Sequence, residues 1–310
     1  MISGFVGFHT HKYSNLFYLL ITTFFYNILI ALIFNFFDSS LIKDIKYFLY
    51  PIFITDYWYF DCYFLMYFFL PIINQGINGM DLKSMKNCIL ILFLIFSCLG
   101  EIKNYTQRFA SKDILKINNG FSTYWLLILY FYGSYFGKFH KNKKSNFLYY
   151  IKFIIILIMA ALIRTKIIIY KMGKNNINMS RIVDYAAPSE VLISYSFIMI
   201  FSNYNINNKI ILKLIKIFAP LTYGVYLIHN HFLVRKYIIS KYFQWLLKLE
   251  KSGLIFLAEF LCCFGIFIFC SLIDYMRILL FKLLKIKDIL FSVQNIIEKI
   301  SNISYPFIYL

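Results

Sequence analysis

The chain has 310 residues, of which 61% are hydrophobic and only 15% are charged, and its mean hydropathy is +0.68. These polar side chains are too few to cover the surface of a soluble protein of this length. The composition therefore excludes a soluble domain and indicates an integral membrane protein. The formal net charge of +18 comes from lysines and arginines in short runs between apolar segments, which is typical of charges facing phospholipid headgroups and excludes a nucleic-acid-binding face.

Apolar segments long enough to cross about 30 Å of hydrocarbon recur along the chain. Each must be helical, because a backbone surrounded by lipid has to satisfy its own hydrogen bonds. The predicted fold class is therefore all-α, a polytopic bundle of membrane helices in which residues 1–281 form the transmembrane domain. In chain order the predicted helices cover residues 16–37, 57–75, 86–101, 120–138, 147–166, 187–204, 217–235 and 253–275.

The C-terminal segment, residues 282–310, has a different pattern. Apolar and basic residues alternate at helical spacing in FKLLKIKDILFSVQNIIEKI, which predicts an amphipathic helix lying on the membrane surface. A helix that binds a protein partner is the alternative. Basic residues in short loops mark the cytoplasmic side, and they place the C-terminus there: Lys138, Lys141, Lys143, Lys144, Arg277, Lys282, Lys285 and Lys287.

The six cysteines all lie inside apolar segments. They have neither the spacing of a metal site nor a histidine close by in the sequence. We therefore interpret them as small packing residues and expect no metal site and no disulfide.

Ionisable side chains inside the predicted helices are candidates for a functional site, since each is costly in lipid unless it is paired or faces a wet cavity. Asp61 could pair with Arg164, accept a hydrogen bond from a backbone donor or orient a catalytic histidine. Glu190 follows Pro188 at the predicted start of a helix, where an acid interacts favourably with the helix dipole. Glu259 has no such structural explanation and stays a candidate.

Two charges near the end of the last predicted helix have a structural interpretation. Asp274 and Arg277 are three residues apart, so they face the same side of a helix. We expect an ion pair at the membrane interface there.

The most specific candidate is His229, in the segment PLTYGVYLIHNHFLVR. It could donate a hydrogen bond to a neighbouring helix, or it could carry a proton during catalysis, because histidine titrates near neutral pH. His231 follows two residues later, and two such positions on a regular helix are about 200° apart. The two rings therefore cannot share one cavity or one metal ion unless the helix is broken there.

Four segments together resemble one family. MISGF, at Met1, resembles the end of a phenylalanine-rich helix, and YWYFDCYFLMYFFLPIIN resembles an aromatic helix that closes in Pro-x-x-Asn. NGFSTYWLLILYFYGSYFGKF is similar to a glycine-containing middle helix, and LTYGVYLIHNHFLVR to a late S/T-x-G-x-Y-L-x-H helix, the most specific of the four. The family is acyltransferase family 3, whose members are multi-span O-acyltransferases of bacterial surface sugars.

This resemblance implies transfer of an acyl group, usually acetyl, in the cell membrane. The donor substrate would be acyl-CoA on the cytoplasmic side, the acceptor a hydroxyl of a lipid-linked or surface glycan, and no cofactor would be bound. His229 is then the candidate catalytic residue, and Asp61 is a further one. The side chains expected to line the substrate site are Trp58, Tyr63, Tyr226, Arg164 and Glu259.

Two departures from the family pattern affect this interpretation. Many members place a glutamate five residues after the tryptophan of the aromatic helix, where this chain has Tyr63 after Trp58; a subset encoded with polysaccharide biosynthesis genes resembles the tyrosine version. The main catalytic motif of the family, a basic residue and a histidine about three turns apart on the first helix, would precede Met1. We expect the in-frame codons upstream to encode it.

Two other functions remain open from the sequence. An O-antigen polymerase or a ligase of lipid-linked sugars would also have about ten spans, but we would expect a large external loop rich in arginine and aspartate. A transporter or flippase of lipid-linked sugars would use paired intramembrane charges between two related halves, and no such halves are visible in the sequence.

Overall fold

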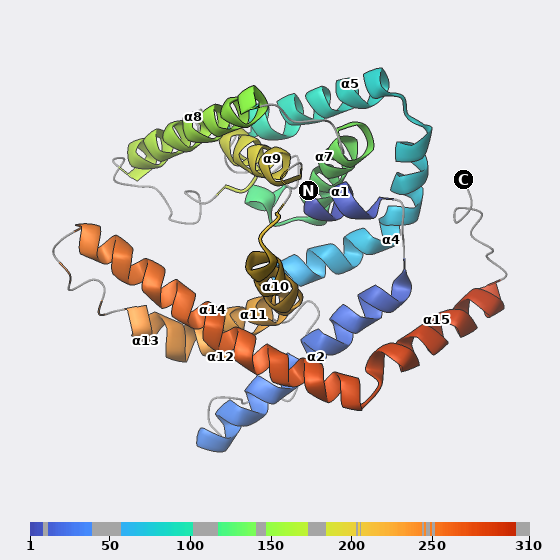
Figure 1. The fold of residues 1–310 in the computed structure, drawn as a ribbon, viewed down its shortest axis with the longest axis vertical. Coiled ribbons are helices and arrows are strands. Elements are labelled where there is room, and N and C mark those ends of the chain that lie inside the picture. Colours follow the sequence, from blue (N-terminus) through green and yellow to red (C-terminus); the bar gives the residue numbers. More distant parts are fainter. Residues whose placement is uncertain are drawn as a thin grey trace. The chain divides into compact units, whose positions relative to one another are not determined.

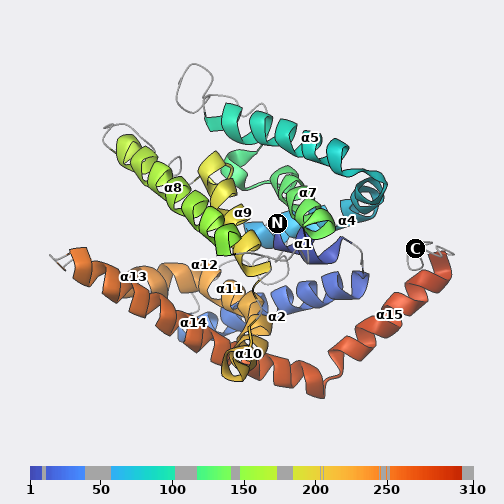
Figure 2. The ribbon, with the colours of Figure 1, turned by 45° about the horizontal axis from the view of Figure 1, so that its top comes forward.

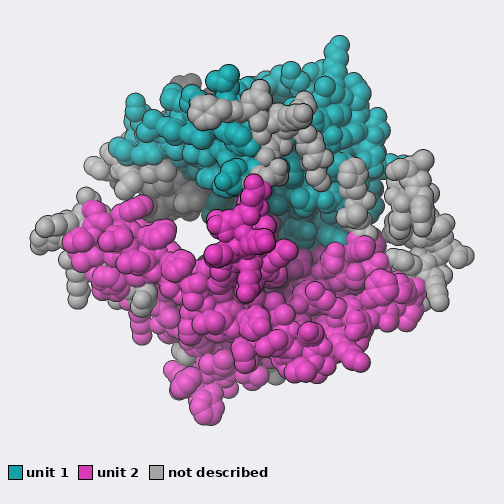
Figure 3. Space-filling model, viewed as in Figure 1, with its two compact units in different colours: residues 1–11, 62–205 teal, residues 12–61, 206–310 magenta. Residues whose placement is uncertain are grey.

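The computed structural model describes residues 1–8, 12–38, 57–101, 117–140, 147–172, 184–202, 204, 206–243, 245, 249 and 252–301. Every regular element in these ranges is a helix, which confirms the predicted all-α class (Figure 1). The chain forms two compact units, unit 1 with residues 1–11 and 62–205 and unit 2 with residues 12–61 and 206–310 (Figure 3).

Within the described ranges, six helices are long and apolar enough to cross a membrane: Tyr13–Phe37, Trp58–Gly79, Leu82–Glu101, Leu148–Ile167, Lys209–Asn230 and Gly253–Leu283. The chain is thus a multi-pass membrane protein. The two other predicted spans are helical but shorter, since α7 (Thr123–Phe139) has 17 residues and α9 (Pro188–Ser202) has 15. The sequence predicted these two spans to be a few residues longer, at residues 120–138 and 187–204.

Unit 1 contains a helix pair that packs backbone against backbone. Gly133 and Gly137 on α7 have the G-x-x-x-G spacing that lets two membrane helices approach closely, and the partner segment α1 (Ile2–Gly7) contributes Gly4. A Cβ atom on any of these three glycines would collide with a backbone carbonyl of the other segment. The absence of side chains at these positions is what allows α1 to lie against α7.

Two polar contacts fix α7 to α4 (Trp58–Gly79). The Tyr130 hydroxyl donates a hydrogen bond to Oδ1 of Asn74 at 2.7 Å, and both groups are buried. The Lys138 ammonium donates to three backbone carbonyls at the C-terminal end of α4, at 2.7 to 3.0 Å. Lys138 therefore caps a helix end, where a cation is favourable, as well as marking a basic loop. Lys141, Lys143 and Lys144 lie outside the described residues.

The rest of unit 1 consists of α5 (Leu82–Leu92), its π-helical continuation η2 (Phe93–Cys98), η3 (Asn118–Gly120), α8 (Phe147–Met172) and α9. The Asp81 carboxylate caps α5 by accepting hydrogen bonds from Ser84 and Lys83, and these bonds lower the pKa of Asp81. Figure 2 shows α8 and α9 side by side. The Tyr149 hydroxyl, which donates to the Met199 carbonyl at 3.2 Å, joins these two helices.

Unit 2 is built around α11 (Thr222–Asn230), which packs on both α2 (Tyr13–Phe37) and α14 (Ser252–Leu283), and a hydrogen bond from Tyr26 to Asp274 joins α2 to α14. Its predicted C-terminal helix is present as α15, which packs on α2: the Gln294 amide oxygen accepts from the Ser14 backbone N–H at 3.0 Å. Placement of α15 on the membrane surface stays a prediction, and residues 302–310 lie outside the described residues. The helices of unit 2 are α2 (Tyr13–Phe37), α10 (Lys209–Phe218), η5 (Ala219–Leu221), α11 (Thr222–Asn230), α12 (Phe232–Val234), η6 (Arg235–Ile239), α13 (Ser240–Phe243), α14 (Ser252–Leu283) and α15 (Ile286–Ser301).

Candidate functional site

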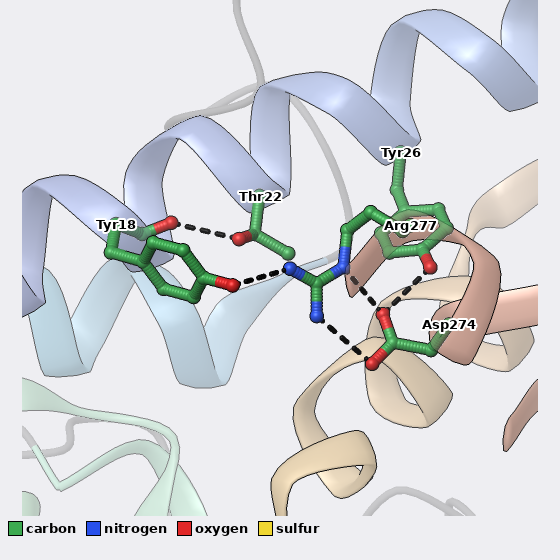
Figure 4. Close-up of polar contacts among 5 residues, drawn as sticks. All are labelled: Tyr18, Thr22, Tyr26, Asp274 and Arg277. Atoms are coloured by element: carbon green, nitrogen blue, oxygen red, sulfur yellow. Dashed lines mark hydrogen bonds and ion pairs between the residues drawn. The ribbon is translucent and has the colours of Figure 1, made fainter. Parts of the chain in front are cut away.

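A buried ion pair holds α14 against α2 in unit 2 (Figure 4). The Asp274 carboxylate accepts from the Tyr26 hydroxyl at 2.7 Å and from Nε and Nη2 of Arg277 at 2.7 and 3.0 Å. Nη1 of Arg277 donates to the Tyr18 hydroxyl at 2.8 Å. The pair expected from the sequence forms, but Asp274 is 0% exposed and Arg277 only 5%. It therefore lies between neighbouring helices, and its position relative to the membrane interface stays a prediction.

The ion pair also positions α11. Gly224 lies directly under the Asp274 carboxylate, and a Cβ atom at this position would collide with it. On α2, the Thr23 hydroxyl lies 2.7 Å from the hydroxyl of Tyr223, the residue before this glycine. The glycine of the T-x-G-x-Y-L-x-H segment thus has a packing role, and α11 is anchored on two sides five residues before His229.

Aromatic rings gather around Tyr226, in the middle of α11. Its ring centroid lies 6.0 Å from that of Tyr57, 5.9 Å from Tyr59, 6.2 Å from Tyr223 and 6.4 Å from His229. We refer to the four tyrosines Tyr57, Tyr59, Tyr223 and Tyr226 as the tyrosine cluster. It brings the start of α4 next to the late histidine segment, and both of these segments carry family-like motifs.

Two of the predicted site residues border the tyrosine cluster. Trp58 is half-buried, and its ring lies 5.8 Å from that of Tyr59, edge to face. Asp61 is also half-buried, and its carboxylate interacts electrostatically with the hydroxyls of Tyr223 and Tyr226. Trp58 and Asp61 therefore border the tyrosine cluster through Tyr59, Tyr223 and Tyr226, and Tyr226 in turn contacts His229.

The imidazole of His229 is half-buried and forms a hydrogen bond to the backbone of its own helix. Its Nδ1 lies 2.6 Å from the Val225 carbonyl, one turn earlier. Because a carbonyl oxygen can only accept, we assign the ring hydrogen to Nδ1. Nε2 then carries the lone pair and can accept a proton, which is the property required of a general base.

His231 lies where the helix is broken. Its φ of −59° and ψ of 134° separate α11 from α12, and its N–H bonds to the Ile228 carbonyl at 3.4 Å, not to that of Leu227 four residues earlier. The Tyr57 hydroxyl donates to the Leu227 carbonyl instead, at 2.9 Å. The break redirects the chain from Phe232 onward, and the ring of His231 lies 6.1 Å from that of Tyr57.

The remaining predicted site residues lie elsewhere. Arg164 pairs with Glu190 at 3.0 Å in unit 1, and Glu190 is in the first turn of α9, as its sequence context indicated. Tyr63, also in unit 1, packs its ring 6.1 Å from that of Tyr67. Glu259 is exposed on α14 in unit 2.

The sequence interpretation left two residues out of the site, Tyr57 and His231. Tyr57 resembled the other aromatic residues of its helix, and the only signal at His231 was a second histidine at a spacing that argued against a shared cavity. As for metal binding, no group of three or more histidine, cysteine, aspartate or glutamate side chains comes together within the part of the chain that the structure describes.

Comparison with known proteins agrees with this arrangement of motifs. Residues 1–276 match the acyltransferase family 3 profile, described as an acyltransferase domain. No curated protein and no solved structure matches the chain. The matched range includes the start of α4, all of α11 and the ion pair residue Asp274. The chain therefore belongs to acyltransferase family 3 and is a membrane acyltransferase.

Proposed function

We propose that the protein transfers an acyl group, in the simplest case acetyl, from acyl-CoA to a sugar hydroxyl of a surface polysaccharide or its lipid-linked precursor. The observation that supports this most directly is His229, whose hydrogen bond to the Val225 carbonyl leaves Nε2 able to take a proton. Family membership supplies the reaction type. The donor, the acyl group and the acceptor are parts of the proposal.

In the proposed reaction, Nε2 of His229 takes the proton of the sugar hydroxyl as its oxygen attacks the thioester carbonyl carbon. The new C–O bond gives a tetrahedral intermediate, whose negative charge lies on the former carbonyl oxygen. The intermediate collapses, the C–S bond breaks, and the imidazolium returns its proton to the leaving thiolate. The products are the sugar ester and free CoA, and His229 ends in its starting state.

The surroundings of His229 suit a site that holds a sugar and a short acyl group. The rings of Trp58 and Tyr226 offer flat apolar faces, and tyrosine hydroxyls add hydrogen-bonding groups. Asp61 interacts electrostatically with two of those hydroxyls, and we assign it a positioning role toward them. Tyr63, Arg164 and Glu259 stay predicted substrate contacts.

We further propose that the protein resides in the cell membrane with its C-terminus in the cytoplasm, where acyl-CoA is available. It would need no bound cofactor, because the donor substrate brings the activated acyl group. Its partners would be membrane lipids, acyl-CoA and the glycan acceptor, with no role for nucleic acid.

The test uses cells that lack the gene and cells that express the full chain or its variants. The ester content of the surface polysaccharide is measured as base-released acetate and related to the amount of protein in the membrane. We expect His229→Ala to lower the ester content strongly, since loss of a general base costs about 10²- to 10⁴-fold in rate.

His140→Ala is the matched control, because His140 lies at the end of α7 in unit 1 and takes no part in the proposed step. It should leave the ester content unchanged. Full esterification in the His229→Ala cells would contradict the proposal. Movement of lipid-linked sugar across vesicles without consumption of acyl-CoA would favour the flippase instead.

A further inference from the structure

The two histidines at the end of α11 use the same ring nitrogen in opposite ways. Nδ1 of His229 donates to the Val225 carbonyl, whereas Nδ1 of His231 accepts from the backbone N–H of Leu233 at 3.3 Å and caps the start of α12. A nitrogen that accepts a hydrogen bond carries no hydrogen, so we assign the hydrogen of neutral His231 to Nε2. His229 thus presents a lone pair at Nε2, and His231 presents an N–H.

The Nε2–H of His231 is a buried donor that has no acceptor among the described residues. The residue is 1% exposed, and Nε2 has no hydrogen-bond partner among the residues that the structure describes. The nearest polar ring neighbour, Tyr57, has its hydroxyl committed to the Leu227 carbonyl. The other neighbour, Phe232, stacks on the imidazole at 4.9 Å and offers no acceptor. Most buried donors in proteins have a partner, so an unused one calls for an explanation.

The position of this donor relates it to the proposed base. The ring of His231 contacts that of Tyr57, Tyr57 contacts Tyr226, and Tyr226 contacts His229, each at 6.0 to 6.4 Å between centroids. A base and a neutral donor therefore border the same tyrosine cluster.

From these contacts we infer that His231 is a second catalytic residue, whose Nε2–H binds the acyl carbonyl oxygen and stabilises the negative charge that develops on it. This inference rests on the proposed function and adds a role to the same site. An N–H shielded from water interacts strongly with a developing oxyanion, and it is already oriented before the reaction by its bond to Leu233. Neutral imidazole is suited to this role, because a neutral ring can polarise a carbonyl without first being charged.

Two substitutions separate this role from capping. His231→Asn keeps a side-chain oxygen that can cap α12 but removes the donor at Nε2. His231→Gln removes the cap but extends an amide N–H to about the place of Nε2. We expect His231→Asn to lower kcat for acyl transfer from acetyl-CoA to the glycan in native membranes by about 10²- to 10³-fold, with little change in KM or Tm, and His231→Gln to retain more of the rate.

A binding measurement on the full chain in nanodiscs provides a readout that is independent of turnover. The probes are a CoA analogue whose thioester sulfur is replaced by CH2, so that the carbonyl stays, and the same analogue with that carbonyl reduced to CH2. The wild-type chain should bind the carbonyl analogue about 2- to 10-fold more tightly, as one hydrogen bond predicts. His231→Asn should abolish this preference, and His231→Gln should keep part of it.

The outcomes distinguish this inference from the proposed function. If wild-type membranes transfer no acyl group, the proposed function fails, while the preference of the wild-type chain for the carbonyl analogue still tests the donor. If the wild-type chain binds both analogues equally tightly, the inference is overturned, whether or not any variant folds. Wild-type rate and wild-type preference in His231→Asn would also overturn it and leave His231 as the cap of α12.

Discussion

The buried ion pair packs against α11, and the two histidines lie at the C-terminal end of the same helix. The two groups nevertheless use their polar atoms differently. Asp274 accepts three hydrogen bonds and Arg277 donates three, all to each other or to Tyr18 and Tyr26. His229 and His231 each bind the backbone through Nδ1, and Nε2 of the buried His231 has no hydrogen-bond partner among the described residues. Each nitrogen of the Arg277 guanidinium and each oxygen of the Asp274 carboxylate has a partner, which indicates a structural role, whereas the unused ring nitrogen of His231 indicates a site.

The ion pair also supports the histidine segment. A membrane helix with a break needs other contacts to fix its direction, because the break removes a backbone hydrogen bond. Gly224 and the Asp274 carboxylate provide one such contact before the histidines, and Tyr57 binds the Leu227 carbonyl next to the break. The ion pair and Tyr57 thus fix the direction of the helix that carries His229.

Removal of Asp274 should have the largest effect on stability. Asp274→Ala leaves the Arg277 guanidinium buried without its carboxylate, which costs about 3–5 kcal/mol. The Tm in detergent and the amount of protein in the membrane should both fall. Glu259→Gln is the control, because Glu259 is an exposed acid on the same helix, and it should leave the Tm unchanged.

The double substitution Asp274→Leu with Arg277→Leu sharpens this prediction. Replacing both members of a buried pair by apolar residues removes the unpaired charge, so the loss of Tm should be smaller than in Asp274→Ala. An equal or larger loss would mean that the pair itself, and not the avoidance of an unpaired charge, determines the stability.

A methyl group at Gly224 should have the next largest effect. In Gly224→Ala the new Cβ would overlap the Asp274 carboxylate, and overpacking of this kind costs about 1–3 kcal/mol. Gly265→Ala is the matched control, since a Cβ at Gly265 on α14 would meet nothing within 4 Å. If both variants unfold at the same temperature as the wild type, α11 is not held by this contact.

The smallest of the expected effects on stability concerns Tyr57. Tyr57→Phe removes the hydroxyl that binds the Leu227 carbonyl at the end of α11, and loss of one such hydrogen bond costs about 0.5–1.5 kcal/mol. Tyr124→Phe, at an exposed tyrosine on α7, should not change the Tm. A Tyr57→Phe variant as stable as the Tyr124→Phe variant would show that the break does not need this support.

Much of the fold was predictable from the sequence, because length and apolar composition are local properties. The apolar runs predicted the membrane helices, and the alternating pattern after residue 282 predicted the helix that begins at Ile286. The lengths of α7 and α9 were overestimated. Their true ends depend on capping residues and on packing against neighbours, which a hydrophobic run does not report.

The site was less predictable, because its contacts are non-local. Asp274 and Arg277 had the spacing of a pair, but their burial depends on Gly224 and Tyr26, which are distant in sequence. The break at His231 has no proline or glycine to announce it. Family resemblance pointed to His229, whereas the opposite assignments of the two imidazoles depend on backbone contacts that only the structure provides.

The most direct test measures two quantities, Tm and acyl transfer from acetyl-CoA per folded molecule, on the same preparations of wild type, Asp274→Ala and His229→Ala. The account predicts that Asp274→Ala lowers the Tm and reduces transfer per folded molecule far less than His229→Ala does, because Asp274 acts only through the position of α11. It predicts that His229→Ala keeps the wild-type Tm and loses about 10²-fold or more of the transfer. Transfer at the wild-type rate in folded His229→Ala would contradict the assignment of the site to the histidine segment.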